Sequence, residues 1–186
     1  MVANQAVVDT KNGDLQNAGS VSVDMTTNTE RRSFLLKKYR AHYDELFPGV
    51  PEVSSEELIQ LLLQPSSAES PIVIDCRSEA EQKVSMFPGA ISTKELEANF
   101  EEYKDKNLIA YCAIGRRSGM FTKRMLEEHP GLKIRNHIGG ILDWTHAGGE
   151  FMDPQSREQT NKVHPGGVYH LPSIAIKPDL QVVLPI

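Results

Sequence analysis

Short apolar runs alternate with amphipathic stretches through the middle of the chain. Residues 71–77 and 108–112 each begin as a continuous apolar run and end in polar or reactive side chains, a pattern typical of strands buried on both faces of a sheet. Helices are predicted around these two strands at 54–63, 94–103, 119–129 and 141–146, and a further strand at 133–136. This alternation predicts an α/β fold in which helices cover both faces of a parallel sheet.

Polar and proline-containing stretches flank this region. Residues 1–29 are mostly polar and show no sustained period, so we expect a disordered tail. Residues 30–50 place apolar side chains at helical spacing before a Pro-Gly pair, which predicts a helical extension. Residues 151–186 contain five prolines, which exclude long helices and predict an extended arm along the domain surface. The chain is therefore interpreted as one domain at 51–150 with three appended segments.

Composition and charge narrow the class of protein. The 186 residues are 39% apolar and 24% charged, enough to bury one sizeable core. The net charge of −5 disfavours general binding to nucleic acid or to an anionic membrane. The longest apolar run, residues 58–63, is too short to span a bilayer, and the first 30 residues lack a signal-peptide core. We expect a soluble, cytoplasmic monomer that binds neither nucleic acid nor a membrane.

The chain has two cysteines, Cys76 and Cys112. So few thiols in a chain of this length argue against a disulfide framework and for a reducing compartment. Cys76 lies within an apolar run, which predicts a packed core thiol; if it faces Cys112, a redox couple becomes available. The six histidines show no metal-ligand spacing with the cysteines, so we expect no metal and no cofactor.

The most informative chemistry follows the second apolar run. Cys112 ends that run, and a small basic loop separates it from the helix predicted to begin at Gly119. Backbone N–H groups at a helix N-terminus bind anions, and with two nearby guanidinium groups they favour the nucleophilic thiolate. Cys112 is therefore the candidate nucleophile. The candidate anion-binding residues are those of the loop, Ala113, Ile114, Gly115, Arg116, Arg117 and Ser118.

Four segments occur in a fixed order at suitable spacing: Asp-Cys-Arg at 75–77, Phe-Pro-Gly-Ala-Ile at 87–91, Cys-Ala-Ile-Gly-Arg-Arg-Ser at 112–118 and Gly-Gly-Ile-Leu-Asp-Trp at 139–144. Together they resemble a single rhodanese (sulfurtransferase) domain over roughly residues 52–150. The resemblance implies a parallel sheet flanked by helices. It also implies a sulfurtransferase of the thiosulfate type.

The implied reaction transfers sulfane sulfur through a persulfide on Cys112. The donor is thiosulfate, 3-mercaptopyruvate or a small-molecule or protein persulfide, and the acceptor is a thiol or cyanide. Preorganised loop amides would stabilise the persulfide anion, and Gly115 gives the backbone the freedom to direct them inward. Arg116 is expected to attract an anionic donor, and Arg117 to brace the loop against a carboxylate.

Neighbouring residues are expected to support this loop. Asp75 and Arg77 follow the adjacent strand, where Asp75 is expected to accept hydrogen bonds from the loop. Glu81 is a candidate partner for an arginine. The sequence also departs from the family: Ala113 and Ile114 stand where many thiosulfate-active members carry basic residues, so a protein persulfide or another thiol compound is a candidate donor instead of thiosulfate. Ser-Met-Phe at 85–87 replaces a small residue and a histidine, which removes the polar function expected there.

Three other interpretations remain open. Related phosphatases and arsenate reductases place the arginine six residues after the cysteine, whereas here the spacing from Cys112 to Arg117 is five, and a general-acid aspartate is not evident. The same fold also serves as a non-catalytic binding module, although this chain keeps the cysteine, the glycine and the arginine of the loop. Cys112 as an inert core thiol is the third interpretation. Trp144 is assigned to the core or to the rim of the pocket.

Overall fold

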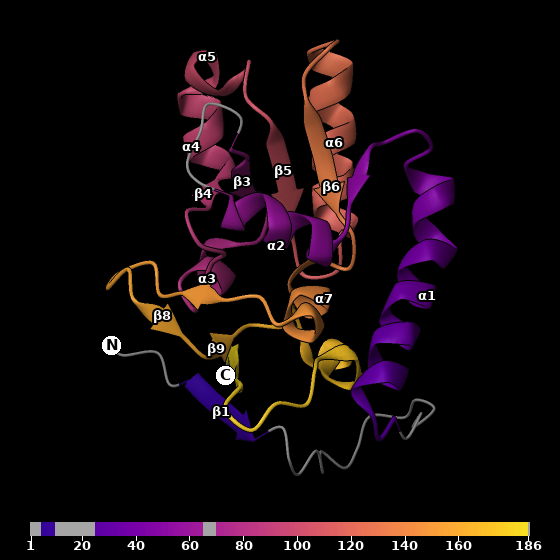
Figure 1. The fold of residues 1–186 in the computed structure, drawn as a ribbon, viewed down its shortest axis with the longest axis vertical. Helices are drawn as coiled ribbons and strands as arrows, with labels where there is room; N and C mark the ends of the chain where they lie inside the picture. Colours follow the sequence, from indigo (N-terminus) through magenta and orange to yellow (C-terminus); the bar gives the residue numbers. More distant parts are fainter. Residues whose placement is uncertain (1–4, 10–24, 65–69, 186) are drawn as a thin grey trace.

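A five-stranded parallel sheet forms the centre of the protein in the computed structural model, which describes residues 5–9, 25–64 and 70–185 (Figure 1). All its pairings are parallel. The strands, in spatial order, are β2 (Glu52–Val53), β6 (Ile134–His137), β5 (Leu108–Tyr111), β3 (Ile72–Asp75) and β4 (Ile91–Ser92). Strands β3 and β5 are the two apolar runs, and β5 is buried along its whole length. The predicted α/β class is confirmed.

Helices cover both faces of this sheet. On one face, a cluster of buried apolar side chains joins β3 and β5 to α4 (Thr93–Ala98) and α6 (Arg116–Glu128), with α5 (Phe100–Tyr103) beside it. On the other face, α2 (Ser55–Leu63) and α7 (Gly140–Ala147) pack around Trp144 and Phe87. Helix α3 (Glu79–Gln82) lies in the connection between β3 and β4. Trp144, which is 2% exposed, is a core residue.

A long N-terminal helix, α1 (Asn28–Leu46), packs beside the sheet domain. Thr27 caps it through a capping box with Glu30, which satisfies the first free N–H groups. Buried aromatic side chains follow one another along the helix and its C-cap: the ring of Tyr39 stacks on that of Tyr43, with 4.5 Å between their centroids, and Tyr43 meets Phe47 at a tilt, with 4.9 Å between centroids. The helix predicted within 30–50 is thus present. Among the described residues, no helix is long and apolar enough to cross a bilayer.

The C-terminal arm wraps back over the domain. It contains β7 (Phe151–Met152) paired with β8 (Gln159–Thr160), then β9 (Lys162–Val163), the 3-10 helix η1 (Val168–Ser173) and β10 (Gln181–Pro185). In agreement with its prolines, none of its described residues is in an α-helix. Several of its apolar side chains are buried in the core around Trp144, namely Val163, Ile174, Leu180 and Val182. The arm is therefore part of the main core.

The N-terminal tail differs from the prediction in two places. Gln5–Asp9, within the tail predicted to be disordered, forms strand β1, which pairs antiparallel with β10 and completes a three-stranded sheet with β9. The valine-containing sequence of this segment matches the preference of β-branched residues for strands. Residues 25–29 are also ordered: Met25 is buried, Thr27 caps α1, and Asn28 and Thr29 begin that helix. The rest of the predicted tail, residues 1–4 and 10–24, lies outside the described residues.

Candidate active site

Cys112 lies at the carboxyl edge of the sheet, immediately after β5. Its side chain is buried, with 1% of the residue exposed. The backbone N–H of Gly115 donates a hydrogen bond to Cys112 Sγ over 3.2 Å. The predicted strand–loop–helix arrangement therefore places a backbone donor on the candidate nucleophile.

The loop after Cys112 is shorter than predicted. Helix α6 begins at Arg116, not at Gly119, because Gly115 adopts φ +94° and reverses the chain as the N-cap. Arg116, Arg117 and Ser118 accordingly form the first helical turn, whose N–H groups have no intrahelical acceptor. The positive end of the helix dipole lies three residues from the cysteine. Ser118 is fully buried, and its hydroxyl has no hydrogen-bond partner among the described residues.

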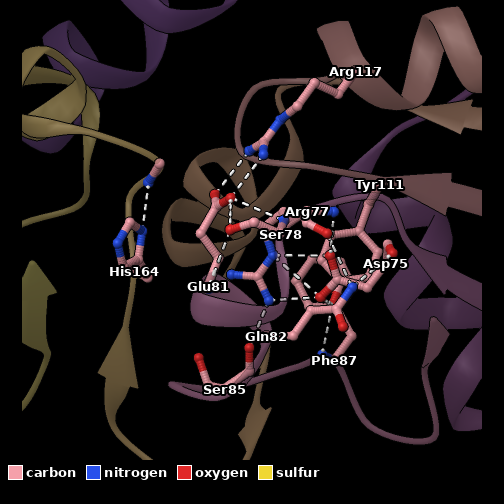
Figure 2. A network of polar contacts seen from close by, with 11 residues as sticks. Asp75, Arg77, Ser78, Glu81, Gln82, Ser85, Phe87, Tyr111, Arg117 and His164 are labelled. Atoms are coloured by element: carbon pink, nitrogen blue, oxygen red, sulfur yellow. Dashed lines mark hydrogen bonds and ion pairs between the residues drawn. The ribbon is translucent and has the colours of Figure 1, made fainter. Parts of the chain in front are cut away.

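The two arginines of this turn have different surroundings. Arg117 forms a two-point ion pair with Glu81, with both N–O distances at 2.7 Å (Figure 2). The predicted bracing of Arg117 by a carboxylate and the candidate role of Glu81 are both confirmed. Arg116 instead lines a surface recess together with Phe47 and Met120. Its expected role in attracting an anionic donor stays a prediction.

The carboxylate of Glu81 is firmly ionised. Burial alone would raise its pKa, but hydrogen bonds from Arg117 and from Ser78 outweigh burial and hold the pKa at about 2. Ser78 donates both its backbone N–H and its hydroxyl to Glu81, in the capping box of α3. The ion pair thus ties the first turn of α6 to the first turn of α3.

Asp75 supports the end of β3 but does not bind the loop, contrary to the prediction. Its carboxylate accepts hydrogen bonds from the backbone and the guanidinium of Arg77 at 2.6–3.1 Å and from the Tyr111 hydroxyl (Figure 2). These donors occupy both carboxylate oxygens. Arg77 also donates to the carbonyl of Ser85 over 2.5 Å. Because Tyr111 immediately precedes Cys112, the network fixes the point where the reactive loop leaves the sheet.

The Gly-Gly motif holds the loop from another side. The N–H groups of Ile141 and Leu142, in the first turn of α7, donate to the carbonyls of Cys112 (2.8 Å) and Ala113 (3.2 Å). A methyl group on Gly140 would lie 2.3 Å from the Cys112 carbonyl oxygen. Only glycine allows this approach, which explains the motif physically.

The C-terminal arm covers the loop, a contact that the sequence analysis missed. A methyl group on Gly166 would lie 2.6 Å from the side chain of Ala113, so the backbone at Gly166 packs closely against that side chain. His164 accepts a hydrogen bond from the N–H of Gly166 through Nδ1 over 3.1 Å (Figure 2). Burial lowers the pKa of His164 and holds that of His170 at about 4, so both imidazoles are neutral at neutral pH. The small side chain at Ala113 is what leaves room for the arm.

Cys76 follows β3 as Cys112 follows β5. Its N–H donates to the carbonyl of Tyr111 over 2.8 Å, and its side chain packs against the apolar cluster on the α6 face. Burial first, and then the neighbouring Cys112, raise the pKa of Cys76 well above the ordinary value. Both cysteines are free. Cys76 is thus a packed, protonated thiol beside Cys112.

A buried Ser–His–Asp group lies near the site but is a structural network. Ser55 donates to Asp143 over 2.6 Å and contacts His137 Nε2 at 2.8 Å, and all three side chains are buried. Arg32 of α1 makes a two-point contact with the same Asp143. The Ser55 proton is therefore directed at a carboxylate and not at the histidine. The group joins α1, α2 and α7.

The sequence matches one family model and several curated proteins. The sequence model described as Rhodanese-like domain matches residues 55–147, half of the chain. Among curated proteins, tRNA uridine(34) hydroxylase of Acinetobacter baylyi is 27% identical over 154 residues, covering 74% of this chain and 48% of that protein. The protein of the same name from Acinetobacter baumannii (strain AYE) is 26% identical over 161 residues, covering 77% and 50%. The chain thus spans about half the length of these relatives.

Two solved structures illustrate the similarity in three dimensions. A rhodanese-like domain protein from Staphylococcus aureus shares 22% identity with a TM-score of 0.43, covering 51% of this chain and 91% of that one. A thiosulfate sulfurtransferase from Pseudomonas aeruginosa shares 21% identity with a TM-score of 0.49, covering 72% of this chain and 25% of that one.

Proposed function

This chain belongs to the rhodanese-like domain family, and from that premise we propose that it transfers sulfane sulfur through a persulfide on Cys112. The observation that supports the proposal most strongly is the backbone hydrogen bond from Gly115 to Cys112 Sγ at the N-terminus of α6. An N–H group that already points at the sulfur before the reaction stabilises a thiolate nucleophile and an anionic intermediate, because it does not have to reorient.

The reaction consists of two displacements at sulfur. In the first, the Cys112 thiolate attacks the outer sulfur of the donor, a new S–S bond forms, and the donor's own S–S or C–S bond breaks with its electron pair leaving on the departing group. In the second, an acceptor thiolate or cyanide attacks the outer sulfur of the Cys112 persulfide, and the Cys112 thiolate leaves. Each step balances without an external oxidant or reductant, and each passes negative charge through the same site.

The charges around the loop favour a persulfide donor over thiosulfate. Arg117 is already paired with Glu81, and Arg116 lines a surface recess with residues of α1 and α6. The two residues after Cys112 are apolar. A dianion such as thiosulfate gains less Coulomb attraction here than at a loop with free basic side chains. We therefore propose a low-molecular-weight or protein persulfide as the preferred donor.

Mass spectrometry of the intact protein tests this proposal. Incubation with a cysteine persulfide is expected to add about 32 Da, one sulfur atom, to wild type and to the matched Cys76→Ser variant, but not to Cys112→Ser. Thiosulfate and 3-mercaptopyruvate are the comparison donors. Absence of the adduct with all three donors would contradict the proposal and favour a non-catalytic binding module.

A second candidate function comes from the curated relatives, which are named for a reaction on uridine 34 of tRNA. The observation that favours it is the similarity over 154 residues, which includes parts of the chain outside the family match. The net charge of −5 opposes it. Two measurements distinguish the candidates. A reaction on tRNA predicts that unmodified tRNA binds in a gel-shift assay at low salt. The sulfur-transfer proposal predicts a full mass shift with a persulfide in the absence of RNA.

A further inference from the structure

We infer that Asn136 and Tyr39 are positioning residues of the sulfur site: together they hold Gly115 in the conformation that places its N–H group on Cys112 Sγ. The inference rests on the proposed function for its meaning in catalysis, since it assigns residues that support the nucleophile of that reaction. Neither residue belongs to the four sequence segments that carry the family resemblance, and Tyr39 lies on α1, outside the residues matched to the family model.

Asn136 fixes the carbonyl of Gly115 from the side of the sheet. It lies in β6 and is fully buried. Its Nδ2 donates two hydrogen bonds, one to the Gly115 carbonyl (3.1 Å) and one to the Tyr39 hydroxyl (3.0 Å). The reverse orientation of the amide would set its oxygen against the Gly115 carbonyl, so the contacts determine which way it points. The same carbonyl also accepts the N–H of Gly119, the first hydrogen bond of α6.

Tyr39 packs its ring against the Cα of Gly115. The tyrosine is 4% exposed, and its ring lies so close that a methyl group on Gly115 would be 2.4 Å from Cε2. Its hydroxyl accepts from Asn136 and donates to Glu52 over 3.3 Å. Burial raises the pKa of Tyr39 above its ordinary value, so this hydroxyl keeps its proton. Arg40 holds Glu52 with two further hydrogen bonds of 2.6 and 3.0 Å.

This confinement has a chemical consequence because glycine is the residue least able to hold its own conformation. The N–H and the carbonyl of Gly115 belong to consecutive peptide groups, joined at a Cα with φ +94°. Fixing the carbonyl and the Cα therefore fixes the direction of the N–H that donates to Cys112 Sγ. A donor that must be reoriented during the reaction stabilises the developing charge less than a preorganised one. Asn136 and Tyr39 thus act on the cysteine through Gly115.

The test uses Asn136→Leu, which removes both donors at similar volume, and Tyr39→Phe, which keeps the ring and removes the hydroxyl. Tyr103→Phe is the matched control, because Tyr103 is half-buried near the start of β5, the end opposite to Cys112. All variants carry Cys76→Ser, so that Cys112 is the remaining thiol. The readout is the rate of iodoacetamide alkylation against pH, which requires no sulfur donor.

Weakened support of the thiolate is expected to move the midpoint of the alkylation profile upward by about 0.5–1 pH unit in Asn136→Leu and Tyr39→Phe. Below the midpoint, this equals a roughly three- to tenfold slower reaction. Circular dichroism establishes that each variant is folded; if Asn136→Leu is not, Tyr39→Phe decides. A folded Tyr39→Phe with the wild-type profile overturns the inference, as does an equal shift in Tyr103→Phe. Failure of sulfur transfer with an intact alkylation shift would instead contradict only the proposed function.

Discussion

Replacing Gly115 by alanine perturbs the site at its most constrained point. The added methyl group would lie 2.4 Å from Tyr39 Cε2 and 3.1 Å from the His137 carbonyl oxygen. The left-handed conformation at φ +94° costs an alanine about 1–2 kcal/mol, and pushing a packed ring aside costs about 1–3 kcal/mol more. Gly115→Ala is therefore expected to lower the free energy of unfolding by about 2–5 kcal/mol, the sum of these two contributions.

Gly131 provides a matched control because it has the same φ of +94° and no described atom within 4 Å of an added methyl group. Gly131→Ala therefore carries only the conformational cost, about 1–2 kcal/mol. Urea denaturation measures both free energies, and single-turnover persulfide formation measures the reaction.

We expect Gly131→Ala to react at the wild-type rate. Gly115→Ala is expected to react about 10²- to 10³-fold more slowly, the effect of removing one preorganised donor. Equal destabilisation by the two substitutions, together with a wild-type rate in Gly115→Ala, would show that neither the Tyr39 contact nor the Gly115 N–H matters to the site.

Three further predictions concern the surroundings of the loop. Glu81→Gln is expected to lower the free energy of unfolding by about 1–2 kcal/mol, a value that allows for the half-exposed Arg117. The pKa of Glu81 is about 2 in the folded protein against an ordinary 4.5. The stabilisation is therefore present above pH 4.5 and disappears as the pH falls towards 2. Urea denaturation should therefore show a smaller difference in the free energy of unfolding between wild type and variant at pH 3 than at pH 7. Gly166→Ala places a methyl 2.6 Å from Ala113 at φ +87°, so it should displace the arm and accelerate alkylation of Cys112; an unchanged rate contradicts the covering contact. Cys76→Ser should retain full persulfide yield in intact-mass spectra, because the half-buried thiol of Cys76 has a raised pKa and stays protonated. A reduced yield would show that Cys76 takes part in the reaction.

Local sequence patterns were sufficient to predict the parallel sheet and the position of Cys112 at its edge. Two continuous apolar runs can be buried only between layers of helices, so β3 and β5 and the parallel sheet were predictable. The position of Cys112 at the carboxyl edge follows from that topology. The pairing of Arg117 with a carboxylate was also predictable, because an arginine beside a buried turn needs a counter-charge.

The remaining contacts depend on segments far apart in the sequence. The apolar periodicity of 30–47 predicts a helix but not that Tyr39 packs on Gly115, since the packing partner is set by the path of the chain. The spacing of the residues does match this contact: Tyr39 and Tyr43 are four residues apart on α1, and they lie against Gly115 and Gly119, which are also four apart. The close approach of the C-terminal arm at Gly166 likewise arises from tertiary packing.

Some local predictions were wrong for local reasons. Helix α6 starts at Arg116 because Gly115 itself supplies the left-handed cap, whereas its apolar pattern begins later. Asp75 was expected to bind the loop, but Arg77 is only two residues away and donates hydrogen bonds to both carboxylate oxygens. Short-range ion pairs of this kind compete directly with the longer-range contacts that the sequence analysis considered.

The proposed function requires Cys112 to carry sulfur from one molecule to another. To test this, the protein is loaded with a persulfide donor, the donor is removed by gel filtration, and cyanide is then added. We expect the protein to lose the added mass of about 32 Da while close to one thiocyanate appears for each protein molecule, and Cys112→Ser to release none. A loaded protein that keeps its extra sulfur in the presence of cyanide and thiol acceptors would contradict the proposed function.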